Sequence, residues 1–135
     1  MFLIALCNGS PARAESCTSI RSIKFDPGAS GAVVRGAVAR GEVECLGLAA
    51  KAGQEASIAI SSVEKNAVFQ FYQPGWTIAR DAGDVTVNGK PYAGAGEADD
   101  AMKWSGRLAG SGVQLLVVGS TRGGATYELR LTIRP

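Results

Sequence analysis

The carboxy-terminal segment of the chain, TYELRLTIRP, alternates strictly between apolar and polar residues. Its apolar members occupy every second position: Tyr127, Leu129, Leu131 and Ile133. A period of two is that of a strand with one buried and one solvated face. Other short segments are apolar on one face or on both, and they cover residues 19–25, 31–40, 44–50, 56–62, 68–72, 102–108 and 113–119. No segment of ten or more residues keeps the 3.6-residue hydrophobic period of a helix, so we expect a chain made of strands.

Glycine-rich turns separate these segments. They read DPGASG, KAGQ, QPGW, GSG and RGG, in a sequence with 18 glycines. Short strands at regular spacing without crossover helices predict an all-β fold, a single-domain antiparallel β-sandwich of about eight strands, with a closed barrel as the alternative. Segment 113–119 is apolar on both faces and is expected at the centre of a sheet. Gly36, inside a strand, indicates a bulge or a close backbone approach.

Residues 77–100 form the one long stretch without clear alternation. We expect it to be irregular, apart from a short strand at DVTVNG and at most one helical turn at GEADDAM. Carboxylates gather in or beside it: Asp81, Asp84, Glu97, Asp99 and Asp100. A calcium site or a glycosidase carboxylate pair is an alternative to solvated loop acids. The spacing fits no calcium-loop pattern, and a sandwich offers a sugar little cleft, so solvated acids are the favoured interpretation.

Composition narrows the function classes. The 135 residues suit one domain, and 46 % hydrophobic against 19 % charged residues allow a real core. A net charge of +2 is too small to predict nucleic-acid binding. The sequence has no histidine, which excludes Ser-His-Asp and Cys-His catalysis and argues against zinc. No phosphate loop or dinucleotide fingerprint is present. We therefore expect no enzyme, no cofactor and no metal.

The first residues are expected to be an export signal. An apolar run from Met1 to Cys7 is followed by a polar break and by Ala12-Arg13-Ala14, the A-x-A pattern of a signal-peptidase site. Residues 1–14 are therefore predicted to be a signal peptide and residues 15–135 the β-sandwich domain, in a periplasmic or secreted protein. The run is short and lacks a basic start, which is consistent with a start codon upstream. No other segment has the length of a membrane span.

Cysteine usage agrees with export. Removal of Cys7 with the signal leaves Cys17 and Cys45 as a single pair. In an oxidising compartment these two are expected to form a disulfide, worth about 3.5 kcal/mol in the chain-entropy model. Two buried free thiols are the alternative.

Several motifs along the chain carry a family resemblance. They include Lys51-Ala-Gly-Gln54, Phe69-x-Phe-Tyr72-x-Pro-Gly75, Trp104-x-Gly106-x-Leu108-x-x-Ser111-Gly112 and Thr121-Arg122-x-x-Ala125-x-Tyr127. This order resembles the periplasmic inhibitors of goose-type and invertebrate-type lysozymes. It is also similar to the β-sandwich modules at the carboxy ends of secreted bacterial peptidases. The resemblance covers roughly residues 25–133 and consists mostly of turns and core positions.

The resemblance implies a partner-binding loop. In those inhibitors a protruding Ser-Gly-x-Tyr loop enters the lysozyme cleft near the catalytic carboxylates, and goose-type inhibitors also carry a Thr-Arg pair followed by a second arginine. Ser111 and Gly112 match the first motif, with Gln114 in place of the tyrosine. Arg122 matches in the second motif, with Thr126 in place of the later arginine. Because one strand separates Gly112 from Arg122, we expect the two turns to lie at its opposite ends.

These observations predict an exported, non-catalytic binding protein, an inhibitor that inserts a surface loop into a lysozyme active-site cleft. Ser111, Gly112, Gln114 and Arg122 are the expected partner contacts. The alternatives are a plain hairpin turn at residues 110–112, whose glycines supply positive φ, and a solvated turn cation at Arg122. The alternative function is an envelope module that binds glycan or protein, with Trp76 and the acidic 77–100 stretch as its contacts. Trp76 is the aromatic residue kept as a surface contact, since Phe69 and Trp104 fall on apolar strand faces and are expected in the core.

Overall fold

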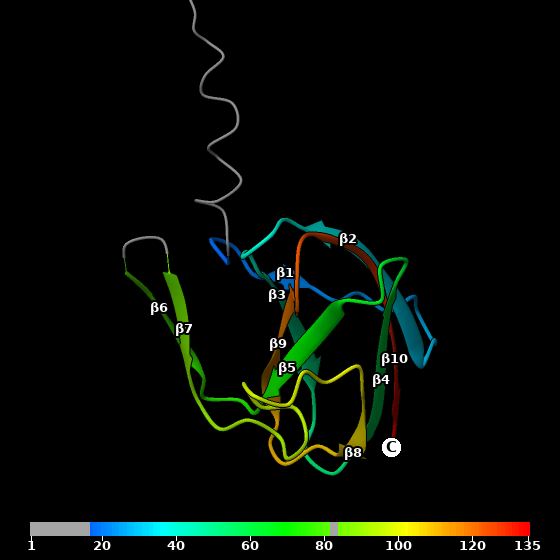
Figure 1. The fold of residues 1–135 in the computed structure, drawn as a ribbon. Coiled ribbons are helices and arrows are strands. Elements are labelled where there is room, and N and C mark those ends of the chain that lie inside the picture. The colour runs from blue at the N-terminus through cyan, green and yellow to red at the C-terminus, as the bar shows by residue number, and fades with distance from the viewer. Residues whose placement is uncertain (1–16, 82–83) are drawn as a thin grey trace, which may run out of the picture.

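The computed structural model describes residues 17–81 and 84–135 of the chain, so the predicted signal peptide and Cys7 lie outside the described residues. Two four-stranded sheets pack face to face as a β-sandwich (Figure 1). Sheet A has the order β1 (Arg21–Ser22), β3 (Glu44–Ala50), β9 (Gly112–Ser120) and β5 (Ala67–Tyr72). Sheet B has the order β2 (Gly31–Val38), β10 (Ala125–Arg134), β4 (Glu55–Ser62) and β8 (Lys103–Arg107). The predicted all-β sandwich is confirmed.

The alternation of the carboxy-terminal segment decides which face of sheet B is buried. On β10, Tyr127, Leu129 and Leu131 are buried, whereas Thr126, Arg130 and Thr132 are exposed. The buried set meets the inner face of sheet A, to which Phe69, Phe71, Leu46, Leu48 and Leu116 contribute. Each such side chain contributes about 1.5–3 kcal/mol when it is removed from water.

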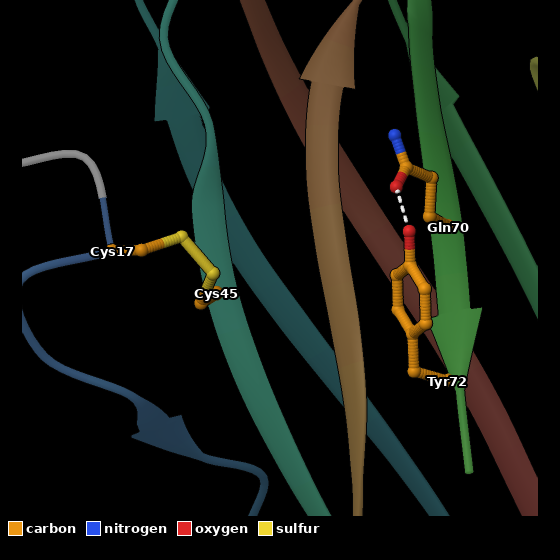
Figure 2. Close-up of a disulfide and its surroundings, with 4 residues drawn as sticks. All are labelled: Cys17, Cys45, Gln70 and Tyr72. Carbon is orange, nitrogen blue, oxygen red and sulfur yellow. Dashed lines mark hydrogen bonds between the residues drawn. A yellow bond between two sulfur atoms is a disulfide. The ribbon is translucent and has the colours of Figure 1, made fainter. Parts of the chain in front are cut away.

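Strand β9 is apolar on both faces because both faces are covered. It lies between β3 and β5 in sheet A, so its predicted central place is confirmed. Leu116 and Val118 face the core between the sheets, and Leu115 and Val117 belong to a second buried cluster with Tyr72 and both cysteines. Figure 2 shows this outer side of the sheet, where the hydroxyl of Tyr72 donates to Gln70 Oε1 over 2.6 Å.

The predicted disulfide is present. Cys17 and Cys45 are bonded across a sequence separation of 28 residues, with their Cα atoms 5.1 Å apart (Figure 2). The bond anchors the segment that precedes β1 to the central part of sheet A, and both cysteines are buried.

Removing this crosslink is expected to lower the free energy of unfolding by about 3.5 kcal/mol, because the open chain regains the entropy of a closed loop. Urea denaturation of the Cys17→Ser/Cys45→Ser variant, compared with the oxidised protein, measures this difference. A loss below about 1 kcal/mol would contradict the entropic account.

Three features differ from the sequence expectations. The short strand expected at DVTVNG is present as β7 (Asp84–Asn88), but residues 77–81 are not irregular, because they form β6 (Thr77–Asp81) and pair with β7 as a hairpin outside the two four-stranded sheets (Figure 1). Ile78, Val85 and Val87 of this hairpin pack against the outer buried cluster of sheet A. The stretch GEADDAM, expected to make one helical turn, forms non-helical turns and a short β-bridge. The pairing of β1 with β3 is parallel, whereas the other strand pairs between described residues are antiparallel. The two four-stranded sheets account for eight strands, and the two strands of the hairpin raise the number in the described residues to ten.

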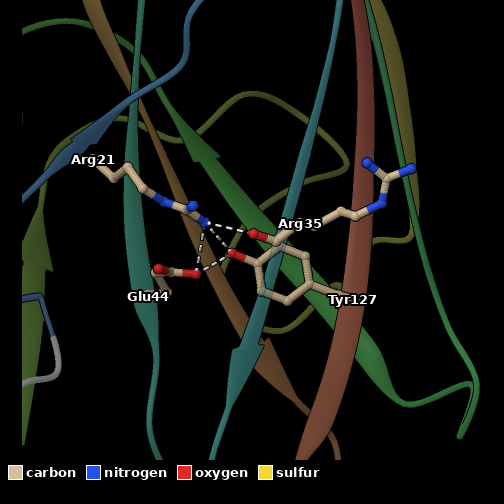
Figure 3. A network of polar contacts seen from close by, with 4 residues as sticks. All are labelled: Arg21, Arg35, Glu44 and Tyr127. Atoms are coloured by element: carbon tan, nitrogen blue, oxygen red, sulfur yellow. Dashed lines mark hydrogen bonds and ion pairs between the residues drawn. The ribbon is translucent and has the colours of Figure 1, made fainter.

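Gly36 is a point of close approach, as the sequence indicated, and the groups that approach it are side chains. Figure 3 shows Tyr127 of β10 and Glu44 of β3 meeting beside β2. The Tyr127 hydroxyl donates to Glu44 Oε1, and Arg21 donates to the same oxygen at 3.3 Å and to the Arg35 carbonyl at 3.2 Å. A Cβ on Gly36 would lie 2.6 Å from the Tyr127 hydroxyl oxygen. The polar network therefore bridges the two sheets only because residue 36 has no side chain.

Stability is expected to fall above about pH 10, the ordinary tyrosine pKa. Burial raises the pKa of Tyr127, and so does the hydrogen bond to Glu44. The folded chain therefore keeps a proton that the unfolded chain loses, and this contribution, complete below pH 10, is lost as the pH rises toward the folded pKa. Urea unfolding between pH 9 and 11.5 is expected to show the decline, with a shallower slope in Tyr127→Phe. Equal slopes in the two proteins would contradict it. Burial also raises the pKa of Tyr72 and Tyr92, so a residual slope remains.

Candidate functional site

The two turns that carry the predicted contacts lie at opposite ends of β9, as expected. Gly112 begins the strand, and Arg122 lies two residues after its last residue, Ser120. At about 3.3 Å per residue the two positions are roughly 30 Å apart. Both turns pass from one sheet to the other, since β8 and β10 lie in sheet B and β9 lies in sheet A. The turn at Ser111 is thus an inter-sheet connection, so the alternative of a plain hairpin turn at residues 110–112 is wrong. We call the two ends the Ser111 end and the Arg122 end.

At the Ser111 end, two inter-sheet connections are joined side by side. The Gly53 amide donates to the Leu108 carbonyl, and the Leu108 amide donates to the Gln54 carbonyl, both over 2.8 Å. The Ser111 hydroxyl oxygen accepts a hydrogen bond from the Ala52 amide over 2.9 Å. The connections 51–54 and 108–111 therefore form one braced tip, with Ser111 and Gly112 exposed on it.

A buried pair of side chains holds this tip from inside. Gln114 has no exposed surface, and its Nε2 donates to the carbonyls of Gly110 (2.9 Å) and Gly112 (3.3 Å). Its Oε1 accepts a hydrogen bond from the Tyr92 hydroxyl over 2.6 Å. The Tyr92 hydroxyl accepts in turn from the Ala109 amide over 3.1 Å. Burial raises the pKa of Tyr92, which keeps this phenol protonated and able to donate.

This geometry changes the role expected of Gln114. The Gln114 side chain lies on the same face of β9 as Leu116 and points toward the core. Because it is fully buried, it has no surface for a partner to contact. It fixes the two carbonyls on either side of Ser111 and thereby fixes the shape of the exposed turn.

Gly112 has a φ of 133°, which favours glycine, and its Cα hydrogens face Pro74, where a Cβ would lie 3.4 Å from the ring.

Trp76 lies beside the same tip rather than at a separate site. Its indole N–H donates to the Val113 carbonyl over 2.8 Å, so the base of the β6–β7 hairpin is tied to the start of β9. The ring is half-buried against the outer cluster of sheet A. Val113 itself is 45 % exposed. The structure thus brings Ser111, Gly112 and Trp76 together, with the exposed apolar side chain of Val113 beside them.

The turn at the Arg122 end is also held by a buried amide side chain. Asn66 and Gln114 are the two buried polar side chains in residues 17–81 and 84–135. Asn66 Nδ2 donates to the carbonyls of Arg122 (2.6 Å) and Gly124 (2.8 Å), so each inter-sheet turn is held by one buried amide. The Arg122 side chain is exposed, and among the described residues it has no ion-pair partner.

Sequence reasoning missed Tyr92 and Asn66. Both residues carry a side-chain hydrogen-bonding group and lie in turn-rich stretches, where hydrophobic periodicity does not indicate which side chains are buried. For Gln114 a signal was present: it precedes Leu116 and Val118 by steps of two, which places it on their face of the strand.

The acidic stretch forms no metal site in the described part of the chain, where no group of three or more ligand side chains is found. Asp99 instead closes a local turn, with its Oδ2 accepting from the Gly96 amide over 2.7 Å. Within the described residues, the structure also contains no helix of the length and hydropathy needed to cross a membrane.

Sequence comparisons identify no relatives: no family model matches the chain, and no curated protein matches it. Solved structures do resemble it. Periplasmic inhibitors of g-type lysozyme, named PliG, match from Aeromonas hydrophila (24 % identity, TM-score 0.65, 86 % of this chain and 96 % of that chain) and from Salmonella Typhimurium (19 %, 0.59, 87 % and 100 %). A PliG mutant from Escherichia coli matches at 20 % identity and a TM-score of 0.58, over 84 % of this chain and 96 % of that one. The chain therefore has the fold of the PliG lysozyme inhibitors over most of its length.

Proposed function

We propose that the protein is an exported, non-catalytic inhibitor of a lysozyme, most directly of the g-type. The observation that carries this proposal is the likeness to solved g-type lysozyme inhibitors across nearly their whole length. We propose a periplasmic location because the neighbours are described as periplasmic inhibitors. It agrees with the Cys17–Cys45 disulfide, since such bonds persist in oxidising compartments. We also propose cleavage of residues 1–14 and a mature domain of residues 15–135.

We propose that the Ser111 end enters the lysozyme cleft. Glycosidase clefts carry paired carboxylates, which accept hydrogen bonds. The Ser111 oxygen already accepts from the Ala52 amide, so its hydroxyl proton remains to donate to a carboxylate. Small residues at Gly110 and Gly112 keep the tip narrow, and exposed Val113 adds apolar contact.

The bracing of the tip supports this role energetically. Ordering a loop on binding costs about 0.5–1.5 kcal/mol for each immobilised side chain, and a loop already fixed avoids much of that cost. Gln114 and Tyr92 fix the tip through buried hydrogen bonds before any partner arrives. A stable complex buries about 800 Å² on each partner, more than one turn supplies. Trp76 and the neighbouring 51–54 connection are the surfaces that would enlarge the contact.

The test is a titration of lytic activity. Purified protein is added to goose-type, invertebrate-type and chicken-type lysozymes that act on bacterial cell walls. A stoichiometric loss of activity with the goose-type enzyme is expected, with weaker or no loss for the other two. Full activity of all three enzymes at micromolar protein would overturn the proposal.

The alternative, an envelope module that binds through Trp76 and the acidic stretch, has less support from the geometry. The Trp76 N–H is committed to Val113, and Asp99 is committed to a local turn. Calcium-dependent thermal stabilisation, or peptidoglycan binding that is lost in Trp76→Ala, would favour this alternative.

A further inference from the structure

The outer face of sheet B is hollowed by an open trough of about 770 Å³ that runs across its strands. Cross-strand register places four small residues in one row as its floor: Gly31, Thr132, Ser57 and Ser105. The hydroxyl oxygens of Ser57 and Ser105 are 3.3 Å apart. A smaller hollow of about 360 Å³ shares these two serines and continues the trough toward the end of β10. The floor therefore offers hydroxyls and no large side chain.

Cations border this floor on both sides. The row on one side contains Arg130 and Lys103 together with Val33 and Ala59, and the row on the other contains Arg134 and Arg107 with Glu55 between them. Because same-face residues along a strand are about 6.6 Å apart, the two cationic rows are roughly 13 Å apart. Lys24 adds a further charge on the lining of the larger hollow.

The trough concentrates positive charge. Five basic side chains line the two hollows against two carboxylates, Asp26 and Glu55, whereas the whole sequence has 14 basic and 12 acidic residues. Arg107 pairs with Glu55 and Arg130 pairs with Glu128. For Lys24, Lys103 and Arg134, the described part of the chain supplies neither an ion pair nor a hydrogen bond to the side chain. Unpaired cations around a polar floor attract anionic ligands.

From this arrangement we propose that the outer face of sheet B is a second binding site, for an acidic glycan. Sugar hydroxyls match the Ser57, Ser105 and Thr132 floor, and carboxylates on the sugar match the bordering cations. A nucleic-acid strand would need aromatic stacking, and no aromatic side chain lines either hollow. A peptide would add to a sheet edge, whereas this trough crosses paired strands. The site lies on a sheet face, apart from the inter-sheet turns proposed for lysozyme, and does not depend on that proposal.

Calorimetric titration with an oligogalacturonate, a carboxylated glycan, tests the assignment without any lysozyme present. Binding is expected in low salt and is expected to weaken at least tenfold in Lys24→Gln/Lys103→Gln. The matched control, Lys65→Gln/Lys90→Gln, removes the same charge elsewhere and is expected to change affinity less than twofold. Ser57→Ala/Ser105→Ala is expected to weaken binding without changing the charge.

Four results would overturn the proposal. The first is the absence of oligogalacturonate binding. The second is an equal loss in the control variant, which would indicate attraction to net charge alone. The third is equal or tighter binding of polyglutamate or of a single-stranded oligonucleotide, which would assign the face to another class of polymer. A neutral malto-oligosaccharide is expected not to bind, and binding as tight as that of the acidic glycan would likewise contradict the role of the cations.

Discussion

Replacing Gln114 by leucine is expected to lower the free energy of unfolding by about 3 kcal/mol, although the two side chains have similar volumes. The change removes the partner of the Gly110 and Gly112 carbonyls, whose hydrogen bonds to Gln114 are part-buried, and leaves the proton of the buried Tyr92 hydroxyl without an acceptor. Each unsatisfied buried group costs about 1–3 kcal/mol. Urea denaturation of Gln114→Leu measures the loss. We also expect the exposed turn at Ser111 to lose its fixed shape, and inhibition with it.

The chain offers a matched control. Gln70 lies on β5 in the same sheet, is half-buried and accepts one hydrogen bond, from Tyr72. Gln70→Leu is expected to cost less than about 1 kcal/mol, because water can replace a partner there. In a Tyr92→Phe background the Gln114→Leu change is expected to cost less, since one of the orphaned groups is gone. If Gln114→Leu is as stable as the parent protein, Gln114 does not hold the tip.

Replacing Gly36 by alanine is expected to cost about 3 kcal/mol. A Cβ there would lie 2.6 Å from the Tyr127 hydroxyl oxygen, 2.7 Å from Glu44 Oε1 and 2.8 Å from Tyr127 Cζ. The backbone of Gly36 is not left-handed, so the cost is steric. Overpacking of this kind costs about 1–3 kcal/mol, and displacing the phenol from its carboxylate adds to it. The melting temperature and the urea midpoint of Gly36→Ala measure the effect.

Gly31→Ala is the control within the same strand, because the nearest atom to its added Cβ is 3.5 Å away. It is expected to change stability by less than about 0.5 kcal/mol. Shortening Tyr127 to leucine removes both of its crowded atoms, so Gly36→Ala is expected to cost less in that background than in the parent. An equal cost in both backgrounds would mean that contact with Tyr127 is not the cause.

The strands that could be predicted from sequence are those whose two faces differ, or whose faces are both apolar. Segment 113–119 belongs to the second kind and β10 to the first. Strand β6 was missed because TIARD has a single large apolar residue, Ile78, and because its partner β7 is equally short. Periodicity also does not assign a strand to a sheet. For this reason the sequence left a hairpin turn at Ser111 open as an alternative, although this turn joins two sheets.

The exposed residues of the candidate site could be predicted from the sequence, but the buried hydrogen bonds that hold them could not. Ser111 and Gly112 stand out as a polar tip between apolar runs, and their exposure follows from that pattern. The clamp on this tip depends on Tyr92, which is 22 residues from Gln114 in sequence and meets it only through the fold. Local sequence patterns report neighbours along a strand, not contacts of this separation.

The most direct test of the account is to place a negative charge at each end of β9 in turn and to measure inhibition of a goose-type lysozyme. Ser111→Glu would bring a carboxylate toward the carboxylates of the cleft, whereas Arg122→Glu changes the far end of the strand, roughly 30 Å away. We predict at least a tenfold loss of inhibition in Ser111→Glu and less than a twofold change in Arg122→Glu, with both variants folded by circular dichroism. Retained inhibition in Ser111→Glu together with a loss in Arg122→Glu would contradict it and assign the contact to the Arg122 end.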